Sequence, residues 1–134
     1  MDSENKIIYP ELSYKIVGCL FEVFNELGSN HRESYYQKAV SNEFERKKIK
    51  FVEQFPIDLH YKDEVIGKNF LDFYVENKVV LELKVGAYIK KSNFEQLLSY
   101  LKVSNTKLGI IACFTPSGVR VHRLLNDNPE VVKL

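Results

Sequence analysis

Cysteine is scarce in this 134-residue chain, which contains only Cys19 and Cys113. Both lie in apolar stretches, where a free thiol behaves as a small buried hydrophobic side chain. A disulfide framework or a structural zinc site needs more ligands at closer spacing, and the three histidines are scattered. The sequence therefore predicts two buried free thiols and argues against both kinds of cross-link.

Long apolar runs are also missing. No stretch approaches the roughly 20 apolar residues that cross a bilayer. The start of the chain is acidic and polar, and it lacks the basic-then-apolar pattern of a signal peptide. We therefore expect a cytoplasmic protein with no membrane partner. No linker rich in proline, glycine or serine divides the chain, so we expect one domain over residues 1–134.

Strong net charge is absent as well. The formal net charge is +1, so composition reveals no nucleic-acid partner, which a strongly basic balance would have supported. Short lysine clusters at residues 47–50 and 90–91 are typical of solvated surface.

Hydrophobic periodicity predicts the order of helices and strands. Apolar residues recur at helical spacing over residues 12–27, 31–48 and 91–103. Alternating or continuously apolar patterns predict five strands: 51–61, one ending near 75, 79–85, 108–114 and 119–124. Pro56 would remove a ladder donor, which places the first strand at a sheet edge. The order ααβββαββ predicts an α/β fold with one mixed sheet flanked by helices. The residues from Asn126 onwards are polar, and we expect them to be loosely held.

Two carboxylates lie in neighbouring predicted strands. If the hairpin turns symmetrically about Asn77, so that Val75 pairs with Val79, Asp72 lies opposite Glu82 with Cβ atoms about 5 Å apart. Two acids that close repel each other unless a cation compensates, and carboxylate oxygens are the ligands that Mg²⁺ and Mn²⁺ prefer. A turn shifted by one residue would separate the two side chains onto opposite faces.

A lysine shares the face of Glu82. Lys84 stands two residues further along the same strand, where it can orient a water or stabilise developing phosphate charge. The alternative is that Asp72, Glu82 and Lys84 form a salt-bridged polar patch on a solvated sheet face. Gln96 and Tyr100 are four apart on the third helix, and they share a face beside its apolar stripe. They suit the support of such a site, or they mark the boundary of a half-buried helix.

Glu33 admits two interpretations. It shares a helix face with Tyr36, Val40 and Phe44, so its carboxylate points towards the protein. Asn30 and Glu33 also fit a capping box, with Asn30 as the N-cap. Glu33 is therefore either a metal-site residue or a helix cap.

These elements together resemble the PD-(D/E)XK nuclease superfamily, and the Gln96-x-x-x-Tyr100 element resembles its RecB-like branch. More closely, the core over about residues 12–124 resembles the small GxxExxxY proteins of that superfamily. The match is carried by Glu33-Ser-Tyr-Tyr36, Gln54-Phe-Pro-Ile57, Leu71-Asp-Phe73, Leu81-Glu-Leu-Lys84 and Gln96-Leu-Leu-Ser-Tyr-Leu101. One departure is Asn30, which stands where those proteins have glycine; asparagine tolerates positive φ, so the turn can survive.

The resemblance implies that Asp72 and Glu82 bind a divalent metal and that Lys84 is catalytic. It also implies that Gln96 and Tyr100 support the site and that Glu33 adds an acid. We accordingly expect a nuclease that hydrolyses phosphodiester bonds of DNA or RNA with Mg²⁺ or Mn²⁺. The alternative is a non-catalytic module that binds nucleic acid or protein through the same fold, and a homodimer is a further expectation.

Overall fold

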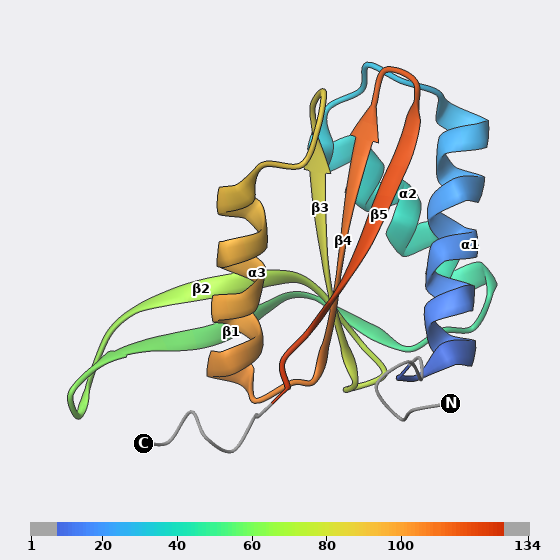
Figure 1. Cartoon of the computed structure of the whole chain (residues 1–134). Coiled ribbons are helices and arrows are strands. Elements are labelled where there is room, and N and C mark those ends of the chain that lie inside the picture. The colour runs from blue at the N-terminus through green and yellow to red at the C-terminus, as the bar shows by residue number, and fades with distance from the viewer. Residues whose placement is uncertain (1–7, 128–134) are drawn as a thin grey trace, which may run out of the picture.

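The computed structural model describes residues 8–127, which form a mixed sheet with helices on both faces (Figure 1). In chain order the elements are α1 (Pro10–Leu27), α2 (Glu33–Arg46), β1 (Phe51–Tyr61), β2 (Glu64–Val75), β3 (Val79–Val85), α3 (Lys91–Ser104), β4 (Leu108–Thr115) and β5 (Gly118–Leu125). The predicted fold class and element order are confirmed. The second helix is shorter than the predicted range of 31–48 at both ends.

The sheet keeps the chain order β1-β2-β3-β4-β5. Strands β3 and β4 are parallel and are connected through α3, whereas every other neighbouring pair is antiparallel. Strand β1 lies at an edge, as Pro56 predicted, because an edge strand loses little when one backbone donor is missing. Strand β4 is buried along its whole length, as its continuous apolar run predicted.

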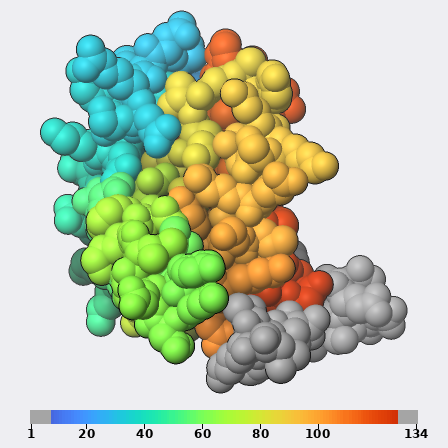
Figure 2. Space-filling model, turned by 90° about the vertical axis from the view of Figure 1, so that its left-hand side faces the viewer, coloured from blue at the N-terminus to red at the C-terminus, as the bar shows by residue number. Residues whose placement is uncertain are grey.

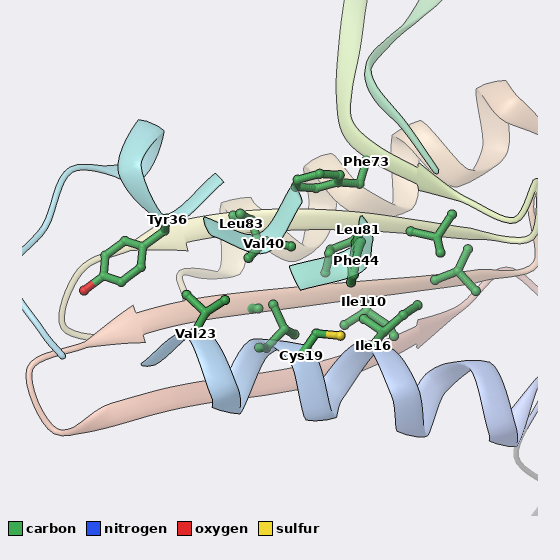
Figure 3. Close-up of a cluster of buried hydrophobic side chains, with 14 of the residues drawn as sticks. Ile16, Cys19, Val23, Tyr36, Val40, Phe44, Phe73, Leu81, Leu83 and Ile110 are labelled. Carbon is green, nitrogen blue, oxygen red and sulfur yellow. The ribbon is translucent and has the colours of Figure 1, made fainter. Parts of the chain in front are cut away.

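Two separate apolar cores hold the layers together, one on each face of the sheet. Helices α1 and α2 cover one face and α3 covers the other (Figure 1). The first core, shown in Figure 3, includes Ile16, Leu20, Val40, Phe44, Phe73, Leu81, Leu83 and Ile110. The second consists of Ile57, Leu71, Val80, Leu97, Leu101 and Ile111. Since each such side chain contributes about 1.5–3 kcal/mol when fully buried, α3 is firmly docked on the sheet.

The loop between α1 and α2 is fixed by Tyr36. Its hydroxyl donates a 2.6 Å hydrogen bond to the Gly28 carbonyl, which lies just beyond α1. Its ring stacks on Phe114 of β4 with centroids 4.1 Å apart, and Figure 3 shows it at the rim of the first core. Asn30 has a φ of 70° in this loop, which confirms that asparagine supplies the glycine-like conformation. The start of α2 is therefore held at a defined place beside the sheet.

Strands β1 and β2 continue beyond the rest of the sheet as a two-stranded ribbon (Figure 1). Only residues 73–75 of β2 pair with β3, whereas β2 pairs with β1 along almost all of its length. The base of the ribbon packs on α3 through Ile57 and Leu71. Its far part is exposed, including Tyr61 and Ile66.

Asn126 contradicts the expectation of a loosely held C-terminal segment. It is 5% exposed, and its side-chain amide donates to the carbonyls of Leu101 and Thr106 at 3.4 and 3.2 Å. The Asn126 amide therefore ties the chain just beyond β5 to the last turn of α3 and to the loop that follows it. The remainder of that expectation, residues 128–134, lies outside the described residues.

The two cysteines are buried and free, as predicted. Burial raises the pKa of the Cys19 thiol to about 11, so it stays protonated at neutral pH and is unreactive. Within residues 8–127, none of the helices combines the length and the apolar character that a membrane span requires.

Candidate active site

The two predicted acids meet where β2 separates from β3. The ladder between these strands pairs Val75 with Val79 and Phe73 with Leu81, which confirms the symmetric register predicted from the turn. Backbone pairing stops at Phe73. In the same register the next position places Asp72 opposite Glu82, so both carboxylates stand at the point of divergence.

Side chains replace the backbone hydrogen bonds at this point. The Asp72 N–H donates to Glu82 Oε2 at 2.9 Å, and the Leu83 N–H donates to Asp72 Oδ2 at 2.8 Å. Each carboxylate thus reaches across to the other strand and accepts one backbone N–H. A carboxylate has about four acceptor positions, so both retain capacity for further ligands.

Burial makes the charge on Glu82 costly. The side chain is 4% exposed, and burial, followed by the nearby Asp72 carboxylate, raises its pKa to about 8. The Asp72 N–H and the Lys84 ammonium oppose this shift but do not cancel it, and Glu33 adds to it. Glu82 therefore lacks enough positive charge around it to stay ionised easily at neutral pH.

Asp72 is affected in the same direction. Burial raises its pKa, while the Leu83 N–H and the Lys84 ammonium lower it in part. Two acids that are both held above their ordinary pKa share a deficit of positive charge. A divalent cation would remove that deficit.

Lys84, Gln96 and Tyr100 face the same site from β3 and α3. Helix α3 begins at Lys91, where Asn93 Oδ1 accepts the Lys90 N–H at 2.9 Å. Lys84 Nζ donates to Gln96 Oε1 at 3.2 Å. Burial and then the Glu82 and Asp72 charges raise the pKa of the Tyr100 phenol, so its hydroxyl lies within their field and remains a donor.

The solvated salt-bridge interpretation of this face is wrong. Glu82 is almost fully buried, and in the described part of the chain Lys84 makes no ion pair within 4 Å of either acid. Lys84 is instead held by the neutral amide of Gln96, which leaves its charge available.

Glu33 is the first residue of α2, not the third. The N-cap is Arg32, which makes no side-chain capping bond, so the capping box with Asn30 is wrong. Partial burial and then the Asp72 charge raise the pKa of Glu33, while Lys84 lowers it. Its carboxylate therefore lies within electrostatic reach of the site. Across residues 8–127, however, no three His, Cys, Asp or Glu side chains are close enough together to hold one metal ion.

Sequence reasoning assigned no role to Gln54. Its neighbours Glu53 and Phe55 pair with Phe73 and Leu71. Gln54 on β1 therefore stands opposite Asp72 on β2. Its side chain also lowers the pKa of Asp72. In an alternating strand Gln54 looked like an ordinary solvent-facing position, and the only signal was its place in the Gln54-Phe-Pro-Ile57 segment of the resemblance.

The segments that carry these side chains meet on one side of the molecule. Figure 2 shows the beginning of α2 in light blue to cyan, the ribbon in green and the segment between β3 and α3 in yellow, gathered on one face. A hollow of about 640 Å³ lies elsewhere, between α1 and α2, and is lined by residues such as Glu22 and Arg46. Neither Asp72 nor Glu82 lines that hollow.

The donor set fits a hard divalent cation. Two carboxylates with spare lone pairs, held in a buried setting that lacks positive charge, suit Mg²⁺ or Mn²⁺, which take oxygen ligands and retain several waters. Within residues 8–127, neither Cys19 nor Cys113 forms a metal-binding group with the two acids. The donor set therefore does not suit a zinc-thiolate site.

A mixed sheet between helices, with two acids and a lysine on adjoining strands, defines a nuclease-like domain of the PD-(D/E)XK type. The sequence matches the PD-(D/E)XK nuclease superfamily over residues 10–124, and the chain belongs to that superfamily. No curated protein matches it.

The comparison with solved structures found two to which the chain is similar. The crystal structure of an alkaline exonuclease (LHK-Exo) from Laribacter hongkongensis is 10% identical with a TM-score of 0.53, covering 96% of this chain and 75% of that one. The crystal structure of SSO0001 is 15% identical with a TM-score of 0.49, covering 92% of this chain and 82% of that one. The exonuclease shares the fold.

Proposed function

We propose that this chain is a nuclease that hydrolyses phosphodiester bonds of DNA or RNA with Mg²⁺ or Mn²⁺. The observation that carries the proposal is the buried, cross-bonded pair Asp72 and Glu82 with Lys84 beside it. Membership of the nuclease superfamily and the shared fold of an exonuclease support it.

Asp72 and Glu82 would hold the cation, and Glu33 would add negative charge near it. When bound, a divalent cation neutralises the charge that builds up on a phosphate during hydrolysis. The fork between β2 and β3 orients the two carboxylates before any ligand arrives, because each is tied to a backbone N–H. Such pre-orientation reduces the reorganisation needed during the reaction.

Lys84 would act on the water or the phosphate. Its ammonium is held by the amide oxygen of Gln96, which fixes its position without neutralising it. It can therefore orient a water or donate to a phosphate oxygen that gains charge. Tyr100 would add a neutral hydroxyl donor from the same helix.

Membership of the GxxExxxY group is part of the proposal. It is supported by Asn30, which adopts the glycine-like φ of 70°. It is also supported by Glu33, whose pKa is raised by burial and then by the charge of Asp72. In that group the additional acid would belong to the same site.

Cleavage of labelled single- and double-stranded oligonucleotides with added Mn²⁺ tests the proposal. Glu82→Gln should lower the rate at least about 100-fold, because loss of a metal ligand removes several kcal/mol of transition-state stabilisation. Lys84→Ala should lower it about 10²- to 10⁴-fold. Lys91→Ala, an exposed lysine on α3, is the matched control and should retain the wild-type rate. Equal rates in all four proteins would refute the mechanism.

Calorimetry separates this proposal from the non-catalytic alternative. A nuclease of this kind must take up Mn²⁺, and Glu82→Gln should abolish the uptake. A protein that binds oligonucleotides with neither Mn²⁺ uptake nor cleavage would instead be a binding module.

A further inference from the structure

The ribbon reverses its faces at Gln54. On one side of this residue, Phe51 and Phe73 contact the core beneath α1 and α2. On the other side, Phe55 and Leu71 contact the core beneath α3. In a regular strand, residues separated by an even number of positions lie on the same face, so the ribbon has rotated by about half a turn here.

The rotation occurs at Gln54, which has an unusual backbone conformation. Its φ is 48°, in the left-handed region, which costs roughly 1–2 kcal/mol for a residue other than glycine. Of the non-glycine residues with positive φ between residues 8 and 127, Gln54 alone lies inside a strand. The others lie in turns, in the loop between α1 and α2, or at helix ends. Glycine would adopt this conformation at less cost, so the glutamine side chain has a purpose of its own.

The side chain stands beside one of the two acids. Gln54 is opposite Asp72 in the register of β1 and β2, at the position where β2 leaves β3. The Asp72 carboxylate is tied to β3 through the Leu83 N–H. Because Gln54 stands opposite Asp72 on β1, its side-chain amide can reach the Asp72 carboxylate from the other side.

We propose that Gln54 is a positioning residue that holds the Asp72 carboxylate in the orientation needed to bind a divalent cation. The inference rests on the proposed function. Gln54 carries no charge, and it lies on β1, which is on the side of β2 opposite to β3. It therefore acts on the cation site through Asp72. Partners that orient a ligating carboxylate in this way typically account for about 10- to 100-fold in metal affinity.

The test compares Gln54→Gly with a control that has the same backbone effect. Lys62 also has a positive φ, 56°, and lies in the turn at the far end of the ribbon. Glycine at either position removes backbone strain, whereas only Gln54→Gly removes the amide beside Asp72. The three proteins are compared by melting without metal, by Mn²⁺ titration calorimetry, and by kcat and KM for oligonucleotide cleavage.

We expect both variants to melt at or above the wild-type temperature. Gln54→Gly should bind Mn²⁺ at least about 10-fold more weakly and should lower kcat at saturating metal with little change in KM. Lys62→Gly should match the wild type in both measurements. If Gln54→Gly binds Mn²⁺ like the wild type, or if both variants weaken binding equally, the role of Gln54 is refuted. If the wild type neither binds Mn²⁺ nor cleaves, the proposed function itself fails, and the inference fails with it.

Discussion

Glu82 gives the metal-free protein a pH dependence of stability that the isosteric change Glu82→Gln should remove. A glutamine carries no charge, and its amide oxygen can still accept the Asp72 N–H that Glu82 Oε2 accepts at 2.9 Å. The substitution therefore removes the buried charge with the cross-strand bond left in place.

The size and direction of the effect follow from the raised pKa of Glu82. Below pH 4.5 the carboxyl is protonated in both the folded and the unfolded chain and contributes no difference. Between pH 4.5 and about 8 the unfolded chain is ionised while the folded protein retains its proton, so the free energy of unfolding falls by about 1.4 kcal/mol per pH unit. The total loss above pH 8 is at most about 5 kcal/mol. Glu82→Gln should thus match the wild type near pH 4.5 and exceed its stability by several kcal/mol near pH 8.

Urea denaturation followed by circular dichroism, in EDTA and at pH values from about 4.5 to about 8, measures this difference. Adding Mn²⁺ should stabilise the wild type, because a ligand that binds only the folded state shifts the equilibrium towards it, and should stabilise Glu82→Gln far less. Glu95→Gln, on the exposed surface of α3, controls for the general loss of an acid. A wild-type stability that does not fall over this range, or a Glu82→Gln protein that is the weaker of the two near pH 8, would show that the reasoning is wrong.

Three further changes test the supporting structure, each by urea denaturation. A Cβ at Gly109 would stand 3.0–3.1 Å from two leucine side chains of α3, so Gly109→Ala should lower the free energy of unfolding by about 1–3 kcal/mol; an unchanged value would mean that α3 is loosely docked. Tyr36→Phe should lose about 1 kcal/mol, because it removes the 2.6 Å hydrogen bond to the Gly28 carbonyl. Asn30→Ala should lose about 1 kcal/mol while Asn30→Gly loses none, since φ is 70° at that position; equal losses would contradict the backbone argument.

The sequence predicted the helices and strands well because each obeys a regular period on one face. The register between β2 and β3 was predictable for a related reason. A short turn leads from Val75 directly to Val79, with positive φ at Glu76 and Asn77, so the pairing of the two strands follows from the turn. Once that register is known, Asp72 and Glu82 have to be opposite each other.

Two features could not be predicted, because distant parts of the chain determine them. The start of α2 depends on the contact of Tyr36 with Gly28 and Phe114, so the local capping pattern at Asn30 was misleading. The face reversal at Gln54 leaves the alternation intact on either side, so the period alone does not reveal it. Only the positions of α2 and α3 on opposite faces of the sheet make the reversal necessary.

The two cross-strand bonds make the backbone amides of Asp72 and Leu83 reporters of the carboxylates they contact. An amide proton that donates to a carboxylate has a nuclear magnetic resonance frequency that depends on the charge of that carboxylate. Proton uptake, cation loading and the loss of either acid would therefore each be visible in two assigned signals of the resting protein. The state of the site could be followed in this way without any substrate.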